Sequence, residues 1–501
     1  MKLLSPAISR LARFRHWRID QWQQNPIEAQ REVLQDLITH GQYTEFGRKH
    51  GFTEVFNIRS FKKAVPIHEY HDLKPYIDRI LAGEENPLWN TPVHWLAKSS
   101  GTTSDKSKFI PITQESLEDC HFQGAKDVLT LYYQHQSESD LLTGKGLVIG
   151  GSHQISQINE NIHCGDLSAV LLQNTPLWAQ WIRTPELSIA LMDEWEEKIE
   201  KLAQSTIQED VSSISGVPTW TLILLRRILA ITGKPNIKAV WPNLELYIHG
   251  GVSFVPYKEQ FQQVIGPGCQ YLEMYNASEG FFAAQDRPEE EGMLLFLENG
   301  IFYEFMPLSE YGKSDPQTIG LQAVELGKQY ALVISTNGGL WRYLVGDTIQ
   351  FTHLFPFRIK VTGRLKQYIN AFGEELIADN ADQAMAMAAK ACGLEVLDYT
   401  AAPVFMGDGQ KGAHEWLVEF AETPLDLSKF AYELDGALKS LNSDYEAKRY
   451  KDIALEMPHV KALPQGSFNR WLKAKGKLGG QHKVPRLSNT RNYIEEIYAI
   501  L

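Results

Sequence analysis

Hydrophobic residues recur at helical spacing in several parts of the chain. Such stripes predict helices over residues 26–40, 187–202, 220–232 and 377–392. Pro26 suits the first turn of the first helix, and Gly393 follows the last helix, where glycine commonly ends one. Asp426 begins a further helix. Four apolar helices with polar faces are typical of a domain that buries a substantial core.

Shorter apolar runs between these helices predict strands. Residues 294–297 and 301–305 flank Asn299-Gly300, a pair that favours the tight turn of a hairpin. Residues 330–335 form a short buried-strand pattern. Further runs at 402–406 and 415–422 are joined by a glycine-rich turn. The mixture of helices and strands predicts an α/β protein.

Composition narrows the function classes. The 501 residues suggest two or more domains, and their net charge of -12 without a long Lys/Arg run argues against nucleic-acid binding. The four cysteines have neither zinc spacing nor a disulfide framework, which favours a reducing cytoplasm: Cys120, Cys164, Cys269 and Cys392. The longest apolar stretch contains Arg226 and Arg227, so we expect no membrane span. No obligate protein partner is indicated.

A run of small and hydroxylated residues at 99–108 is a candidate phosphate-binding loop. Its residues include Ser99, Ser100, Gly101, Thr102, Thr103 and the closing Lys108. Small residues let backbone N–H groups approach phosphate oxygens, and a lysine adds positive charge. The pattern differs from the common G-x-x-x-x-G-K-[ST] loop, and a plain solvated turn remains an alternative.

Three later segments carry chemistry that agrees with a nucleotide site. Tyr275, Ser278 and Glu279 lie within five residues, and a carboxylate beside phosphates suits Mg²⁺. Asp347 follows a glycine and can accept hydrogen bonds from two ribose hydroxyls. Arg364 follows Gly363, where a domain boundary is predicted. Each segment alone also suits an ordinary turn, but the four together favour nucleoside triphosphate chemistry.

The set resembles the adenylate-forming superfamily of acyl-CoA synthetases and luciferases, and within it the Gretchen Hagen family of acyl acid amido synthetases. The matching motifs are Ser-Ser-Gly-Thr-Thr at 99–103, Ala-Ser-Glu-Gly-Phe at 277–281, Arg-Tyr-Leu-Val-Gly-Asp at 342–347 and Gly-Gln-His-Lys-Val-Pro-Arg at 480–486. They occur in the family's order and extend over nearly the whole chain.

The resemblance implies a fold and a reaction. The expected fold is a large N-terminal mixed α/β adenylate-forming domain, residues 1–363, with a smaller mobile α+β C-terminal domain, residues 364–501. The expected enzyme uses ATP and Mg²⁺ to activate a carboxylic acid as acyl-AMP, then transfers the acyl group to an amine, usually an amino acid. One alternative is an acyl- or aryl-CoA ligase that forms a thioester. Another is a non-catalytic nucleotide-binding regulatory protein.

The resemblance also assigns roles to residues. The loop with Lys108 would hold the β- and γ-phosphates, Ser278 the α-phosphate and Glu279 Mg²⁺. Asp347 would bind the ribose, assisted by Arg364. Tyr275 would stack on adenine, and Gly251 would lie in the adenine-side Gly-Gly loop. Lys483, with Lys477 as second choice, would be the lysine that the smaller domain brings to the reacting phosphate.

Overall fold

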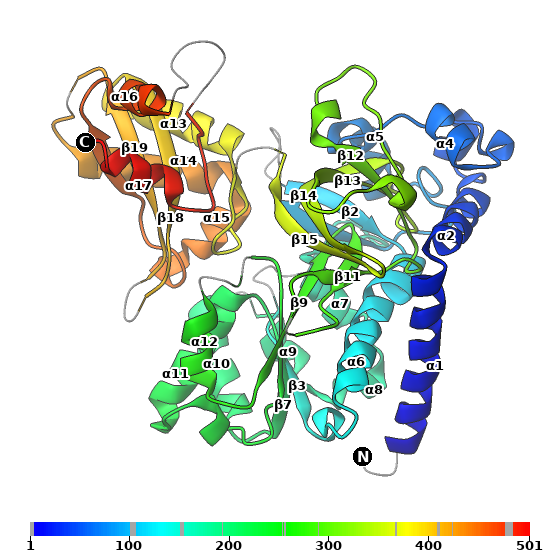
Figure 1. Ribbon diagram of the computed structural model, residues 1–501. Helices are drawn as coiled ribbons and strands as arrows, with labels where there is room; N and C mark the ends of the chain where they lie inside the picture. The colour runs from blue at the N-terminus through cyan, green and yellow to red at the C-terminus, as the bar shows by residue number, and fades with distance from the viewer. Residues whose placement is uncertain are drawn as a thin grey trace.

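The structure is a computed structural model of the chain. It describes residues 5–100, 107–150, 155–192, 194–252, 254, 257–288, 290–365, 368–407, 411–422, 424–475 and 484–501. Within this part of the chain, helices and strands form a large N-terminal body and a smaller C-terminal one (Figure 1). The expected fold class, mixed α/β with a smaller C-terminal domain, is confirmed.

An eleven-stranded sheet forms the centre of the large body. Its strands, in spatial order, are β12 (Ile301–Pro307), β13 (Gln329–Thr336), β14 (Tyr343–Leu354), β15 (Phe357–Arg364), β11 (Met293–Leu295), β10 (Gly280–Ala284), β9 (Gln270–Ala277), β8 (Leu246–His249), β7 (Val211–Ser215), β3 (Lys145–Val148) and β6 (Arg183–Thr184). The neighbouring strands β9, β8, β7, β3 and β6 pair in parallel. The strands from β9 to β12, in the other half, pair antiparallel. Strand β9 therefore joins the two halves.

A second sheet of four strands lies in the same body. Its order is β2 (Ser107–Ile112), β1 (Trp95–Ser100), β5 (His163–Gly165) and β4 (Ser156–Gln157). The main helices are α1 (Ser5–Gln24), α2 (Pro26–Gly41), α3 (Glu45–Lys49), α4 (Ile58–Ala64), α5 (Tyr70–Leu81), α6 (Gln123–His135), α7 (Leu167–Gln173), α8 (Leu177–Gln180), α9 (Leu187–Ala190), α10 (Trp195–Thr206), α11 (Pro218–Thr232) and α12 (Lys258–Ile265). Helices α10 to α12 cover the parallel half of the main sheet (Figure 1).

The C-terminal body is built on a three-stranded sheet, β18 (Val396–Val404), β19 (Ala413–Phe420) and β20 (His459–Leu463). A two-stranded ribbon, β16 (Tyr368–Ile369) and β17 (Leu376–Ile377), precedes it. Its helices are α13 (Ala378–Cys392), α14 (Leu427–Leu441), α15 (Ser443–Lys448), α16 (Ser467–Ala474) and α17 (Asn492–Tyr498).

The two bodies touch through helices α10 to α12. The Tyr257 hydroxyl donates to the Ala371 carbonyl at 2.7 Å, and Gln260 Nε2 donates to the Met406 carbonyl at 2.7 Å. The Lys448 ammonium lies 5.1 Å from the centre of the Trp220 ring. A further hydrogen bond, from Asn370 Nδ2 to the Gly251 carbonyl at 2.9 Å, places the ribbon β16–β17 beside the carboxyl end of β8.

Several predicted elements are confirmed. Helix α2 spans Pro26–Gly41, α11 spans Pro218–Thr232 and α13 ends at Cys392 before Gly393 in the left-handed conformation. The run 330–335 lies in β13, and the runs 402–406 and 415–422 lie largely in β18 and β19. Asp426 caps α14, because its carboxylate accepts from the Lys429 N–H.

Two local predictions are wrong. The runs around Asn299-Gly300 form no hairpin, since β11 pairs with β10 and β15 whereas β12 pairs with β13. Gly300 does have the positive φ of a turn, +69°, but tertiary pairing separates the strands. The predicted helix 187–202 is interrupted between α9 and α10, because the Glu194 carboxylate caps a new helix by accepting from the Glu197 N–H at 2.8 Å.

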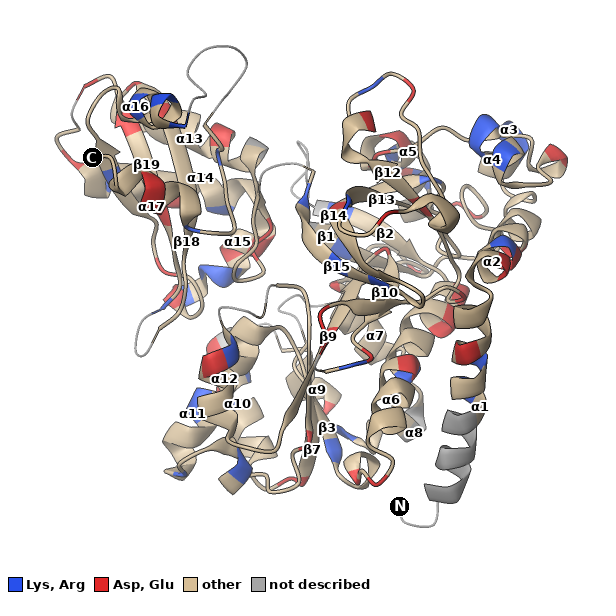
Figure 2. Cartoon of the chain, viewed as in Figure 1, with Lys and Arg blue, Asp and Glu red and all other residues tan. Residues whose placement is uncertain are grey.

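Lys and Arg are scattered among Asp and Glu over the elements in Figure 2, without a basic stripe. Among the described helices, none has the length and hydropathy needed to cross a bilayer.

Candidate functional site

Asp347 and Arg364 lie opposite each other on neighbouring strands. Strands β14 and β15 pair Asp347 with Arg364 in register, and Arg364 Nε donates to Asp347 Oδ1 at 2.8 Å. From β9, the Tyr275 hydroxyl donates to the other carboxylate oxygen at 2.6 Å. Both oxygens of the buried Asp347 side chain are therefore held by donors, while each retains a further lone pair for another hydrogen bond.

The charges of this cluster depend on each other. Burial opposes ionisation of Arg364, yet the carboxylates of Glu375 and Asp347 raise its pKa well above the ordinary value. Burial, with Asp347 alongside, also raises the pKa of the Tyr275 phenol well above its usual range, so Tyr275 stays a proton donor. The cluster is thus a fixed arrangement of one phenol, one carboxylate and one guanidinium.

Ser278 and Glu279 form the turn between β9 and β10. Gly280 begins β10 at φ +159°, and a Cβ there would lie 2.5 Å from Ile301 Cδ1, so the turn requires glycine. Burial raises the pKa of Glu279, partly offset by the nearby Lys108. Among the described residues, no cation forms an ion pair with the Glu279 side chain within 4 Å, and no other residue hydrogen-bonds to it. A desolvated carboxylate in this state is suited to binding a cation.

Lys108 lies in β2, directly opposite Ser99 of β1. Its ammonium is 3.4 Å from the Tyr343 hydroxyl and 5.7 Å from the centre of the Tyr70 ring. Burial lowers the pKa of Lys108, while the charge of Glu279 opposes that shift. Lys108 is therefore a buried cation close to the Glu279 carboxylate.

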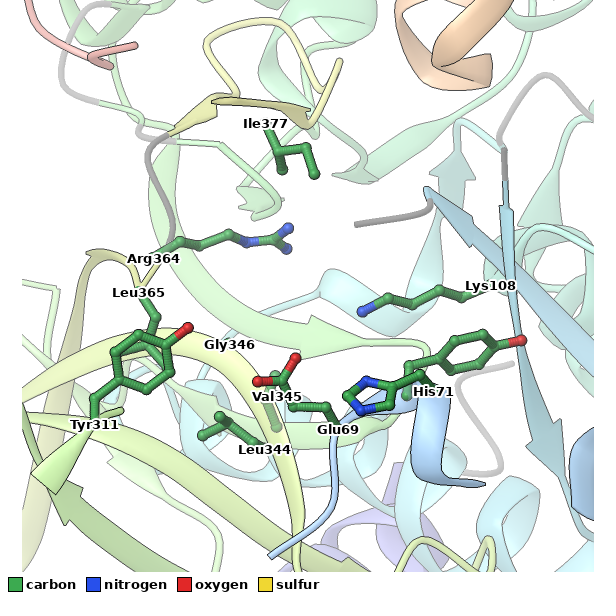
Figure 3. A pocket seen from close by; sticks show the side chains of 11 residues that line it. Glu69, His71, Lys108, Tyr311, Leu344, Val345, Gly346, Arg364, Leu365 and Ile377 are labelled. Carbon is green, nitrogen blue, oxygen red and sulfur yellow. The ribbon is translucent and has the colours of Figure 1, made fainter. Parts of the chain in front are cut away.

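Lys108 and Arg364 extend toward one another from opposite sides of a small pocket of about 50 Å³ (Figure 3). The Glu69 carboxylate faces the same space, and Ile377 of the C-terminal body also lines it. Glu69 and His71 lie at the start of α5, and sequence reasoning missed both. The local pattern around them is that of a helix cap formed by Glu69 and Asp72, and a helix cap does not indicate a binding site.

Gly251 lies at the carboxyl end of β8, with φ +82°. A Cβ on its neighbour Gly250 would lie 2.4 Å from the Met274 carbonyl, so the glycine pair packs against the residue before Tyr275. The Gly251 carbonyl accepts from Asn370 Nδ2 of the C-terminal body at 2.9 Å. The predicted adenine-side glycine is thus close to the Asp347 cluster.

Some predicted residues fall outside the described part of the chain. These are Gly101, Thr102, Thr103, Lys477 and Lys483. For Ser100 the backbone pairs with Ser107, at the edge of that loop. Their roles stay predictions.

Family models match most of the chain. The GH3 family N-terminal domain matches residues 15–269, the GH3 family central domain residues 294–364 and the GH3 family C-terminal domain residues 379–492. The resemblance inferred from the motifs is therefore confirmed.

Individual proteins agree with the family models. Indole-3-acetic acid-amido synthetase GH3.3 of Arabidopsis thaliana is 23% identical over 543 residues, covering 93% of this chain and 90% of that protein. The solved GH3.15 acyl acid amido synthetase is 19% identical, with a TM-score of 0.61 over 96% of this chain and 95% of that one. A 2-hydroxyisobutyryl-CoA ligase, solved in its thioesterification state with 2-HIB-AMP and CoA, is 12% identical, with a TM-score of 0.59 over 94% and 92%. This chain therefore shares its fold with both solved structures.

Proposed function

The chain belongs to the GH3 family, and from that premise we propose that it joins a carboxylic acid to an amine at the pocket around Asp347. The ligase class follows from the family, in which GH3.3 and GH3.15 are amido synthetases. The observation that supports this site is the Asp347 carboxylate, held by Tyr275 and Arg364 beside the buried Lys108 and Glu279. An amino acid is the expected amine.

The nucleotide assignment uses the remaining hydrogen-bonding capacity of this cluster. The free lone pairs of Asp347 would accept the two ribose hydroxyls of ATP. Lys108, with the loop 99–103, would neutralise the β- and γ-phosphates, and Ser278 would donate to the α-phosphate. Gly251 would border the adenine. For Tyr275, stacking on adenine stays a prediction, whereas its hydroxyl already has a partner in Asp347.

The residues present fit Mg²⁺ at Glu279. Mg²⁺ prefers oxygen ligands and usually takes one or two carboxylates together with phosphates and water. Glu279 supplies one desolvated carboxylate, and the described residues contain no group of three His, Cys, Asp or Glu side chains placed to enclose a metal. When bound, Mg²⁺ would offset phosphate charge as the acid approaches ATP.

Both half-reactions displace a phosphate-containing group. A carboxylate oxygen attacks the α-phosphorus, and the bond to pyrophosphate breaks with its electron pair. The amine then attacks the acyl carbon, AMP leaves with the C–O electron pair, and the ammonium proton passes to solvent. Lys108 and Arg364 lower the repulsion between carboxylate and triphosphate, and Lys483 would do so at the α-phosphate.

We keep the division at Gly363-Arg364 as a proposed domain boundary. The main sheet ends at Arg364, and the following strands pair in other sheets. Between the two half-reactions, rotation at this boundary would bring a different part of residues 364–501 to face the pocket. All four cysteines are free thiols, which supports a reducing cytoplasm as the proposed setting.

Pyrophosphate release tests the first half-reaction. The protein is given ATP, Mg²⁺ and a panel of aromatic, indolic and fatty acids, and at least one acid should release pyrophosphate. Asp347→Asn should raise the KM for ATP about tenfold, near 1.4 kcal/mol of lost binding. Asp210→Asn, the same change at an exposed position before β7, should leave KM unchanged. No release from any acid by folded protein would favour a non-catalytic nucleotide-binding protein.

The acceptor is tested with the acyl-adenylate from the active acid. Incubation with amino acids should yield an amide, whereas a thioester formed only with CoA would favour the CoA-ligase alternative. Lys483→Ala should abolish carboxylate-dependent pyrophosphate exchange yet still convert supplied acyl-AMP to product. Loss of exchange in Lys477→Ala instead would transfer the role to Lys477.

A further inference from the structure

The turn between β16 and β17 connects the two bodies at the candidate site. The buried carboxylate of Glu374 organises it, accepting from the Ala371 N–H at 3.2 Å and the Phe372 N–H at 2.7 Å. Glu374 Oε1 also lies 2.7 Å from His414 Nε2 of β19. On the other side, Asn370 Nδ2 reaches the Gly251 carbonyl. The turn is therefore fixed in the C-terminal body and touches the large one.

Glu375, at the end of this turn, has a backbone conformation that L-residues rarely adopt. Its φ is +40°, in the left-handed region, where a Cβ costs free energy and glycine does not. Two residues earlier, Gly373 has φ +87°, with Lys448 3.1 Å from where a Cβ would lie. Of two positive-φ positions in one turn, one is glycine and the other glutamate.

The surroundings hold Glu375 in this conformation. Its N–H donates to Asn370 Oδ1 at 3.2 Å, and its carbonyl accepts from Asn442 Nδ2 at 3.2 Å. Strained non-glycine residues concentrate where a side chain has a task. The strained backbone of Glu375 therefore indicates that its carboxylate has a role.

That carboxylate binds Arg364. Glu375 Oε2 lies 3.1 Å from Arg364 NH1, while Arg364 Nε contacts Asp347 at 2.8 Å. Two carboxylates on different nitrogens fix the plane of a guanidinium, whose fork is rigid. The chain of contacts Tyr275–Asp347–Arg364–Glu375 thus crosses from β9 to the C-terminal body.

We propose that Glu375 is a positioning residue for ATP binding: it holds Arg364 so that Asp347 keeps its lone pairs directed at the ribose. Without Glu375, the guanidinium can rotate about Nε, and the Asp347 carboxylate loses its fixed orientation. The effect acts through Arg364 and Asp347, so Glu375 itself need not touch the nucleotide. The inference rests on the proposed nucleotide site.

Two variants separate this role from a structural one. Glu375→Gln keeps the shape and removes the charge, whereas Glu375→Gly removes the carboxylate and also the backbone strain. Both should raise the KM for ATP in pyrophosphate release roughly fivefold, with kcat within about twofold. Glu375→Gly should melt at about the parent's temperature, because relief of the positive-φ strain offsets the lost ion pair and Arg364 keeps its contact with Asp347. A purely structural residue would not combine equal or higher stability with a raised KM.

Asp347→Asn and Glu395→Gln serve as references. Glu395 is an exposed glutamate of the same body, and its variant should match the parent. A raised KM in Asp347→Asn with parental KM in both Glu375 variants would overturn the positioning role alone. Parental KM in all of them would overturn the nucleotide site itself. A Glu375→Gly variant that melts lower, with kcat and KM both impaired, would make Glu375 structural and also overturn the inference.

Discussion

The large body and the contact between the two bodies are held by different kinds of ion pair. Within the large body, Arg342 Nε and NH2 contact the Glu304 carboxylate at 2.9 and 3.0 Å, and their side chains are only 6% and 1% exposed. At the contact between the bodies, Lys451 lies 3.2 Å from Glu194 and 2.6 Å from Glu196, and all three side chains are about half exposed or somewhat less.

This difference shows which part of the site is rigid. Removing one partner of a buried pair leaves an uncompensated charge, whereas an exposed pair is replaced by water at little cost. The strands that carry Asp347 and Tyr275, and the turn that carries Glu279, lie in the body that contains the buried pair, and we expect them to be rigid. The C-terminal body supplies Glu375 and Ile377 to the site, and its ion pairs with Glu194 and Glu196 are exposed, so we expect those pairs to break at little cost.

The largest expected effect is on the buried pair. Glu304→Gln removes the charge that compensates Arg342, and we expect the free energy of unfolding to fall by about 3 kcal/mol. Chemical denaturation with a global fit checks this value. Glu310→Gln, whose partner Lys313 is exposed, is the matched control and should show no resolved change. Equal stability of both variants would remove the contrast between the two regions.

The next largest effect concerns the chemistry of the large body. Glu279→Gln keeps the size of the side chain and removes its charge, and adenylation should fall at least 10²-fold, on the order of 3 kcal/mol. Glu273→Gln is a close control, because Glu273 lies in β9 and burial also raises its pKa. A near-normal adenylation rate for Glu279→Gln at saturating Mg²⁺ would reduce Glu279 to a turn residue.

The pKa of Glu279 predicts a pH dependence. Burial raises it above the ordinary 4.5, so the carboxylate is protonated at a higher pH than usual, and adenylation should be lost as pH falls through the raised pKa. Mg²⁺ and the proton compete for this group, so more Mg²⁺ should move the acidic limb to lower pH. Rate–pH profiles at two Mg²⁺ concentrations measure the shift. An acidic limb that does not move would indicate that Mg²⁺ binds elsewhere.

The sequence predicted parts of this site because their chemistry is local. Asp347 and Arg364 each follow a glycine break, and the structure brings them together by strand register. For Ser278 and Glu279 the sequence left an ordinary turn as the alternative to a nucleotide site, and the two residues do lie in a turn. Such residues can be found because turn-forming glycines mark the strand ends that carry functional groups.

Other parts depend on strand order, which local patterns do not contain. The bond from Tyr275 to Asp347 joins residues 72 apart in sequence. The hairpin prediction at Asn299-Gly300 failed for the same reason, since each strand found a more distant partner. Glu69 and Glu375 have no recognisable motif, and only the folded chain places them near Arg364.

Tyr275→Phe distinguishes two roles for the same side chain. Phenylalanine keeps a ring that can stack on adenine and removes the hydroxyl that donates to Asp347. Loss of one charge-assisted hydrogen bond predicts a KM for ATP raised roughly fivefold, about 1 kcal/mol, with little change in stability. Tyr271→Phe changes an aromatic four residues earlier in β9 whose hydroxyl has no hydrogen-bond partner among the described residues, and this variant should match the parent. An unchanged KM in Tyr275→Phe would leave stacking as the better role.

The smallest effect on stability is expected at the contact between the two bodies. Lys451→Ala removes the exposed pairs with Glu194 and Glu196, and the denaturation midpoint should stay at the parent value. The same change should let the C-terminal body leave helices α10 to α12 more often. Fluorescence transfer between labels at exposed sites on α12 and α14 would show this as a broader distribution of distances. Lys439→Ala removes a pair that lies wholly within α14, with Asp435, and should leave that distribution unchanged. If Lys451→Ala lowers stability as much as Glu304→Gln while the distances stay fixed, the two bodies form one rigid unit, and the contrast between them disappears.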